Sequence, residues 1–263
     1  MLMAVDVGNT QIVVGLFSLP GGGQRGELLH HWRVGTHSTY TADELSLQLT
    51  QLLALDGLDL AQVSGAVVAC VVPPLQVALR EVLANRLQVP SVMVGPGVRT
   101  GMPMLVDNPK EVGADRIADV VAAYERYGGP AIVVDFGTAT NFEVVSERGE
   151  YLGGVLFPGL EVSLNALTSR GAMLPRVDIA PPQRGVLGKN TVEQLQSGIF
   201  YGFGALVEGV CARIEQEVGH ATVIATGGLA PVVLGASPVI DHWEPWLTLY
   251  GLQAIYHRNQ SDA

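Results

Sequence analysis

The chain has 263 residues, of which 48% are hydrophobic and 15% are charged, so one large or two small domains with a well-buried core are expected. A formal net charge of −10, without any run of lysine and arginine, excludes a typical nucleic-acid surface and favours small molecules or other proteins as partners. No stretch reaches the ~18 uninterrupted apolar residues of a membrane helix, and the N-terminus has no signal-peptide pattern, so we expect a cytoplasmic protein.

Several common kinds of reactive site have no counterpart in the sequence. Cys70 and Cys211 stand in apolar contexts, which favour buried free thiols over a disulfide or a nucleophile. The six histidines have no zinc-type spacing, and no nucleophile elbow or serine triad is present. Lys110 and Lys189 lie beside glycine-rich segments, but neither belongs to a Walker loop. The chemistry must therefore come from carboxylates, hydroxyls and backbone groups.

The first part of the chain predicts the element order βββαβαβ, a mixed sheet. Thr41 and Glu44 have the spacing of a capping box, and the leucines that follow recur at helical spacing. Two prolines at Pro73 and Pro74 are typical of a helix start. The predicted elements are a hairpin of strands 3–7 and 12–17, a strand at 28–34, a helix after Thr41, a strand at 64–72, a helix at 73–86 and a strand at 91–94.

The second part predicts another α/β unit. Its elements are a helix at 114–127, a hairpin at 131–145, a strand near 151–156, helices near 159–168 and 191–218, a strand at 223–226 and a closing helix at 245–257. The long helix contains several glycines, each of which costs roughly 1 kcal/mol of helix propensity. We therefore expect close packing or a break there, and a subunit interface could use this face.

An aspartate-glycine-hydroxyl turn occurs twice, each time between two apolar strands. The first copy is Asp6–Thr10 and the second is Asp135–Thr140. The glycine lets backbone N–H groups approach an anion, the threonine hydroxyls can bond phosphate oxygens, and the aspartate can hold a hydrated cation. An Asp-x-Gly turn is also ordinary hairpin chemistry, but two copies with the same flanks are much less expected by accident. We interpret the pair as a phosphate-binding device.

Duplicated hairpins of this kind resemble the acetate kinase, sugar kinase, Hsp70 and actin superfamily. The resemblance implies two similar ribonuclease H-like (actin-like ATPase) halves, with mixed sheets flanked by helices and a nucleotide cleft between them. A third element of that superfamily, the glycine turn on the adenosine side, fits 223–230. The expected halves are residues 1–112, with the first phosphate hairpin, and residues 113–263, with the second hairpin and the adenosine turn.

Between the two halves, a proline-containing loop turns through Gly113 into a helix. Asp115 and Arg116 fall on its first turn, where N–H groups and the helix dipole favour anions. Ordinary N-terminal helix chemistry would explain the same residues. Arg116 could pair with a substrate carboxylate or with a phosphate oxygen, and the sequence leaves both open.

Four motifs in order make the resemblance more specific, because together they resemble type III pantothenate kinase. They are Asp6–Thr10, Gly113–Arg116, Asp135–Thr140 and Gly188–Thr191, and the match covers essentially the whole chain. This family transfers a phosphoryl group from ATP to the terminal hydroxyl of pantothenate, the first step of coenzyme A synthesis. The resemblance implies Mg²⁺ with ATP, a monovalent cation (K⁺ or NH₄⁺) and a homodimer, with the glycine-containing helix at the interface.

The family's functional residues map onto this sequence position by position. Asp115 would be the general base, Asp135 would bind the monovalent cation, and Asp6 would lie near the magnesium. Thr138 would contact ATP. The first ATP loop would comprise Asp6, Val7, Gly8, Asn9, Thr10, Gln11, Ile12 and Val13, and pantothenate would contact Gly113, Ala114, Asp115, Arg116 and Thr191.

The physical chemistry of alcohol phosphorylation agrees with these implied roles. A primary alcohol must lose its proton as the O–P bond forms, and a positioned carboxylate such as Asp115 can accept it. The chain departs from the family at Val106, where a tyrosine that touches pantothenate is common. Two alternatives stay open, a regulatory protein like the Bvg accessory factor without kinase activity, and a kinase of the same superfamily with another substrate.

Overall fold

The computed structural model describes residues 1–19, 25–171 and 173–260. The chain forms two compact units, which share segments far apart in sequence. The first contains Met1–Met102, Asp107–Ala122 and the chain from Leu247 onward, and the second contains Pro103–Val106 and Ala123–Trp246. The predicted halves divide the sequence after residue 112, whereas the two units are defined by contacts between residues. By that definition, residues 113–122 and the closing helix belong to the first unit.

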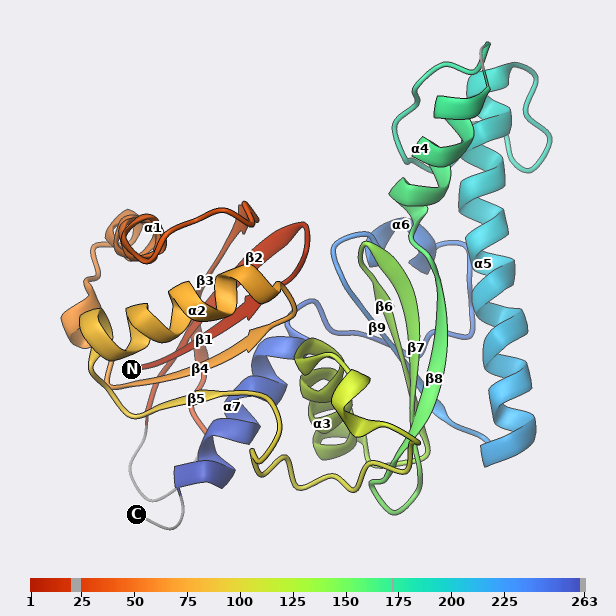
Figure 1. The fold of residues 1–263 in the computed structure, drawn as a ribbon. Coiled ribbons are helices and arrows are strands. Elements are labelled where there is room, and N and C mark those ends of the chain that lie inside the picture. Colours follow the sequence, from red (N-terminus) through yellow and green to blue (C-terminus); the bar gives the residue numbers. More distant parts are fainter. Residues whose placement is uncertain (20–24, 172, 261–263) are drawn as a thin grey trace. The chain divides into compact units, whose positions relative to one another are not determined.

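Each unit is built on a five-stranded mixed sheet, and the two sheets have the same topology (Figure 1). In the first, β1 pairs with β2 antiparallel and with β4 parallel; in the second, β6 pairs with β7 antiparallel and with β9 parallel. The first sheet has the order β3-β2-β1-β4-β5, with β1 Leu2–Val7, β2 Gln11–Phe17, β3 Leu28–Gly35, β4 Gly65–Cys70 and β5 Ser91–Met93. The second has the order β10-β9-β6-β7-β8, with β6 Ala131–Phe136, β7 Ala139–Val145, β8 Tyr151–Pro158, β9 Thr222–Thr226 and β10 His242–Trp243. The predicted duplication of hairpin and sheet is confirmed.

The first sheet is covered on both faces by helices. One face, with Val5 and Val68, packs in a core with leucines of α1 (Ala42–Leu55) and α2 (Pro73–Val82). The other face receives α7 (Leu247–Gln260), whose Leu249 lies directly over Gly15. The closing helix at the far end of the chain therefore completes the core of the first unit.

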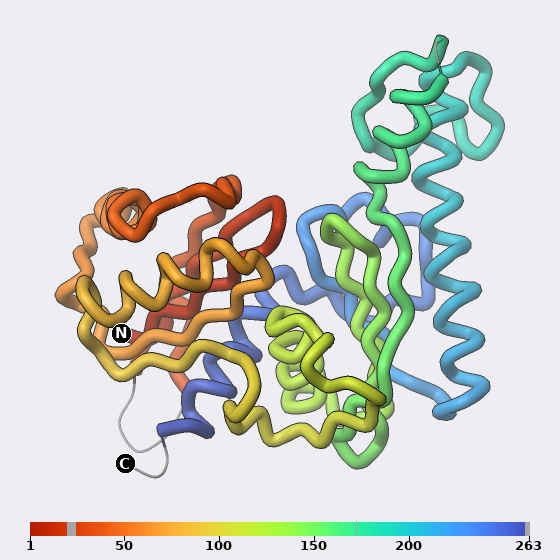
Figure 2. Tube along the Cα trace, viewed as in Figure 1, coloured from red at the N-terminus to blue at the C-terminus, as the bar shows by residue number. Residues whose placement is uncertain are grey.

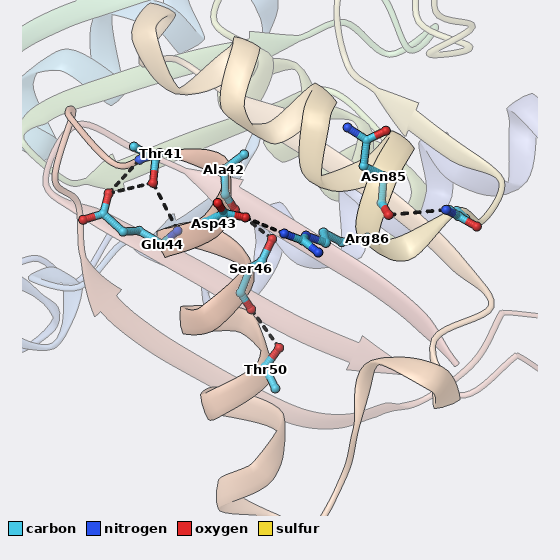
Figure 3. A network of polar contacts seen from close by, with 9 residues as sticks. Thr41, Ala42, Asp43, Glu44, Ser46, Thr50, Asn85 and Arg86 are labelled. Carbon is cyan, nitrogen blue, oxygen red and sulfur yellow. Dashed lines mark hydrogen bonds and ion pairs between the residues drawn. The ribbon is translucent and has the colours of Figure 1, made fainter.

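Local sequence signals account for the helix starts. The predicted capping box is present at α1, where Glu44 donates its N–H to the Thr41 hydroxyl at 3.3 Å and its carboxylate accepts the Thr41 N–H at 2.8 Å (Figure 3). Helix α2 begins at the proline pair and continues as a π-helical turn over Leu83–Leu87, which accounts for the predicted end near Arg86.

The second sheet packs against helices that enclose a separate core. Helix α5 (Thr191–Val218) packs Phe203 and Val207 against Ile132, and α6 (Ala230–Leu234) lies beside α5. From β8 the trace passes into α4 (Leu160–Arg170), which runs beside the first part of α5 beyond the end of this sheet (Figure 2). Helix α3 (Ala114–Tyr127), predicted with the same bounds, has residues in both units.

The glycines of α5 do not break the helix, which runs unbroken for 28 residues. Gly204 explains part of the predicted close packing, because a Cβ there would lie 2.6 Å from the Ala236 carbonyl oxygen. By contrast, a Cβ at Gly198 or Gly202 would meet no described atom within 4 Å. Among the described residues, no helix has the length and apolar character that crossing a membrane requires.

Candidate active site

The first phosphate hairpin is the tight connection between β1 and β2. Asp6 lies in the penultimate position of β1, and the turn at Gly8 is closed by its N–H, which donates to the Gln11 carbonyl at 3.0 Å. Asn9 and Thr10 are exposed at the tip, where a ligand could reach their N–H groups. The side chains of Val7 and Ile12, two of the predicted ATP contacts, are buried in the core. These two could contribute to a nucleotide site only through their backbone.

The second hairpin repeats this construction between β6 and β7. Asp135 lies in the penultimate position of β6, and the Gly137 N–H closes the turn by donating to the Ala139 carbonyl at 3.0 Å. Gly159 approaches from the end of β8 and donates its N–H to the Thr138 carbonyl at 3.1 Å. A Cβ at Gly159 would overlap that carbonyl oxygen and lie 2.5 Å from the Gly137 oxygen. Only glycine allows this approach, which gives Pro158-Gly159 a steric role that sequence alone did not supply.

The adenosine-side turn also reaches the second hairpin. Gly227 has φ +90°, a left-handed conformation that favours glycine, and a Cβ there would overlap the Asp135 carboxylate. The predicted glycine turn and the predicted cation ligand are therefore in contact.

A row of oxygen-bearing side chains crosses the second sheet at this level. Asp135 is paired directly with Asn141 on β7 and with Thr226 on β9, so the three side chains project from the same face. The Asn141 Oδ1 atom is buried and has no hydrogen-bond partner among the residues that the structure describes. A buried acceptor beside a carboxylate is a suitable ligand for a cation. Neither Asn141 nor Thr226 was singled out in the sequence.

The candidate base, Asp115, lies on the first turn of α3, half-buried in the first unit. Its Oδ1 atom accepts the Arg116 N–H at 2.8 Å. Burial raises the pKa of the Asp115 carboxyl, while the Arg116 N–H and guanidinium act in the opposite direction. Gly113 leaves room for this carboxylate, because a Cβ at that position would overlap Oδ1 and lie 3.3 Å from Val71.

Cys70 connects Asp115 with the first hairpin. The pKa of its thiol is raised chiefly by burial, and the charges of Asp6 and Asp115 add to the shift. Asp6 is paired with Ala69, the residue before Cys70, and Gly113 beside Asp115 lies against Val71, the residue after it. The thiol donates to the Val72 carbonyl at 3.3 Å. It stays protonated, in agreement with the predicted absence of cysteine chemistry, and the structure brings Asp6 and Asp115 into one neighbourhood.

Thr191, the remaining predicted substrate contact, is the exposed first residue of α5. Asn190 caps the helix by accepting the Glu193 N–H at 2.9 Å, and the nearly buried Glu193 carboxylate accepts the Lys189 N–H at 2.9 Å. Glu193 was not predicted, although its position three residues after the cap was a usable signal. The cap and Glu193 fix the chain on both sides of Thr191.

Comparisons with known proteins show the family to which the chain belongs. The family model "Type III pantothenate kinase" matches residues 2–213. Proteins named type III pantothenate kinase from Streptomyces griseus and Moorella thermoacetica are 53% and 51% identical to the chain. They cover 100% and 98% of it, and the matches span 100% of each relative.

Solved structures show the same fold at low identity. One, assigned to the Baf family of transcriptional activators from Campylobacter jejuni, is 17% identical with a TM-score of 0.60 and covers 98% of both chains. Another, a reductive activator for a corrinoid, iron-sulfur protein, is 14% identical with a TM-score of 0.52 and covers 98% of this chain and 60% of its own. These likenesses bear on the fold alone. By its family model and its full-length relatives, the chain belongs to the type III pantothenate kinase family.

Proposed function

We propose that the protein transfers the terminal phosphoryl group of ATP to the terminal hydroxyl of pantothenate, with Asp115 as the general base. The observation that carries this role is the half-buried Asp115 carboxylate, whose pKa is raised by burial. The charges of Asp115 and Asp6 both raise the pKa of the Cys70 thiol. A carboxylate with a raised pKa is the stronger base, which suits it to accept the hydroxyl proton. We also propose that the enzyme acts in the cytoplasm, the location expected from the sequence.

The two hairpins would hold the nucleotide. Asn9 and Thr10 are exposed, and their backbone N–H groups would bind the phosphates, while Thr138 on the second turn would supply a hydroxyl. The Asp6 carboxylate at the strand end is a hard oxygen ligand of the kind that Mg²⁺ accepts. When bound, magnesium neutralises charge on the phosphates. Gly113, Ala114 and Arg116, with Thr191, would contact pantothenate.

A monovalent cation would be held by Asp135. The fit rests on the row described above, in which the unpartnered Asn141 oxygen and the Thr226 hydroxyl flank the carboxylate. These are oxygen donors, the ligand type that K⁺ requires, and NH₄⁺ could use the same acceptors. The ion would supply positive charge near the second phosphate turn.

One assay tests the reaction and the cation together. Purified protein is expected to phosphorylate pantothenate with ATP in potassium or ammonium and to lose most activity in sodium. Asp135→Asn should lower activity at saturating potassium by about tenfold or more, because even outer-shell groups of metal sites have effects of this size. Asp43→Asn on the exposed side of α1 is the matched control (Figure 3). Folded wild-type protein without product in any salt would favour the regulatory or altered-substrate alternatives, and equal rates in sodium would remove the cation from the proposal.

We also infer a homodimer formed through the second unit. Large apolar side chains are exposed on both β8 and α4, among them Leu156 at 67% and Leu167 at 50%, with Phe157 also exposed. Where such side chains form one patch, they usually mark a protein contact. Gly198 and Gly202 add an open face on α5, the helix expected at the interface.

The dimer can be tested by mass. Wild-type protein should have twice the monomer mass of 27.8 kDa in light scattering, and Leu156→Asp should shift it toward the monomer. Leu55→Asp, an equally exposed leucine on α1 of the first unit, should leave the mass unchanged. A dimer that survives Leu156→Asp but dissociates with Leu55→Asp would place the interface elsewhere.

A further inference from the structure

Thr36, the residue that follows β3, makes two hydrogen bonds to the first phosphate hairpin. Its N–H donates to the Thr10 carbonyl at 2.9 Å, and its hydroxyl donates to the Gly8 carbonyl at 2.7 Å. The side chain is half-buried, and it lies 28 residues from Gly8 in sequence. Two carbonyls of the turn are thus held from outside the turn.

These two bonds determine how the turn presents its N–H groups. A peptide unit is planar and trans, so the N–H of the following residue points away from the carbonyl. With the Gly8 carbonyl directed to the Thr36 hydroxyl, the Asn9 N–H is directed to the opposite side. The Thr10 carbonyl is engaged in the same way, and its peptide also fixes the Gln11 N–H. The bonds turn carbonyl oxygens toward Thr36, where they do not repel an anion at the N–H side.

The second hairpin provides an internal comparison. Gly159 follows β8 as Thr36 follows β3, and its N–H binds the Thr138 carbonyl at 3.1 Å as the Thr36 N–H binds Thr10. Gly159 has no side chain, however, and the Gly137 carbonyl receives no counterpart of the Thr36 hydroxyl from it. The backbone bond is common to both halves, whereas the hydroxyl bond belongs to the first half.

We propose that Thr36 is a positioning residue that orients the first hairpin for the phosphates of ATP, an inference that rests on the proposed nucleotide role of this hairpin. The hydroxyl is the operative group, because the backbone bond persists with any residue at this position. Threonine suits the task since its β-branch restricts χ1 and keeps the hydroxyl aimed at Gly8.

Thr36→Val removes the hydroxyl and keeps both the shape and the branch at Cβ. We expect KM for ATP and Kd for ADP to rise about fivefold to tenfold, the equivalent of one hydrogen bond. KM for pantothenate should stay within twofold of wild type. Thr36→Ser should recover most of the nucleotide affinity. ADP binding by calorimetry is measured beside the steady-state kinetics, so the result does not depend on turnover.

The matched control is Thr50→Val. Thr50 lies on the exposed side of α1, and its hydroxyl donates to the Ser46 carbonyl at 2.8 Å, so the same kind of bond is removed away from the hairpin (Figure 3). It should leave KM for ATP unchanged. A merely structural role for Thr36 would lower Tm or kcat without a selective loss of nucleotide affinity, and that result, or unchanged ADP binding in Thr36→Val, would overturn the inference. Wild-type protein that binds no nucleotide would instead refute the proposed function.

Discussion

Asp115→Asn is expected to lower kcat for pantothenate phosphorylation by about 10²- to 10⁴-fold, the usual contribution of a positioned general base. Asparagine has nearly the same shape and can still accept the Arg116 N–H, so the start of α3 should be preserved. Only the capacity to take the hydroxyl proton is lost. ADP binding should stay within about twofold of wild type, because the nucleotide hairpin is untouched.

Stability should respond to this substitution in the opposite direction from activity. The folded-state pKa of Asp115 is raised, so the folded state binds its proton more tightly than the unfolded chain does. The stability that this group contributes is therefore lost as pH rises from the unfolded pKa through the folded pKa, and above the folded pKa the buried, ionised carboxylate destabilises the folded state. Asp115→Asn should thus melt at the same temperature as wild type or higher at pH 7. A folded variant that keeps a tenth or more of wild-type kcat would contradict Asp115 as the base. A variant that melts well below wild type at pH 7 would contradict the expected effect on stability.

Gly251→Ala should destabilise the protein far more than the substitutions at Asp115 or Thr36. Gly251 lies on α7 against α3, and a Cβ there would overlap the Ala118 carbonyl oxygen and lie 2.9 Å from its Cα. Both atoms belong to backbone within the first unit, so no flexible side chain can move aside. We expect a cost of about 3 kcal/mol, at the upper end of typical overpacking.

Thermal or chemical unfolding checks this expectation. A cost of this size corresponds to a decrease in Tm of roughly 6–12 °C for a chain of this length. Gly95→Ala is the control, because it makes the same change in the first unit, outside the helix expected at the interface, where a Cβ meets no described atom within 4 Å. There the reduced freedom of the unfolded chain should leave Tm equal or slightly higher. If both variants melt alike, the contact between α3 and α7 does not limit the stability of the first unit.

The sequence was sufficient for the elements that carry local signals. The capping box at Thr41 marks the start of α1, and the repeated Asp-x-Gly turns predict both hairpins. Strand β10 and helix α6 were missed. Each is short, with two and five residues, which is too few for a periodic pattern to emerge.

The parts of the site that the sequence did not predict depend on contacts between distant segments. Thr36 reaches Gly8 only because β3 pairs with β2, and Asn141 and Thr226 flank Asp135 only through the sheet register. The placement of the closing helix on the first sheet likewise follows from tertiary packing, since its residues carry no local sign of their partner. The motifs therefore predicted candidate site residues, but they did not predict the contacts that hold those residues in place.

The first hairpin is held by a side chain and a backbone group of Thr36, and the second is held by the backbone of Gly159. This difference affects how nucleotide affinity can change during evolution or engineering. Around the first turn, nucleotide affinity can be adjusted in small steps, because serine and valine each differ from threonine at position 36 in one group. Neither change alters the backbone bond to the Thr10 carbonyl. Around the second turn no such series exists, since any side chain at Gly159 would collide with the main chain it supports. Libraries aimed at new phosphate donors should therefore vary residue 36 and leave Gly159 fixed.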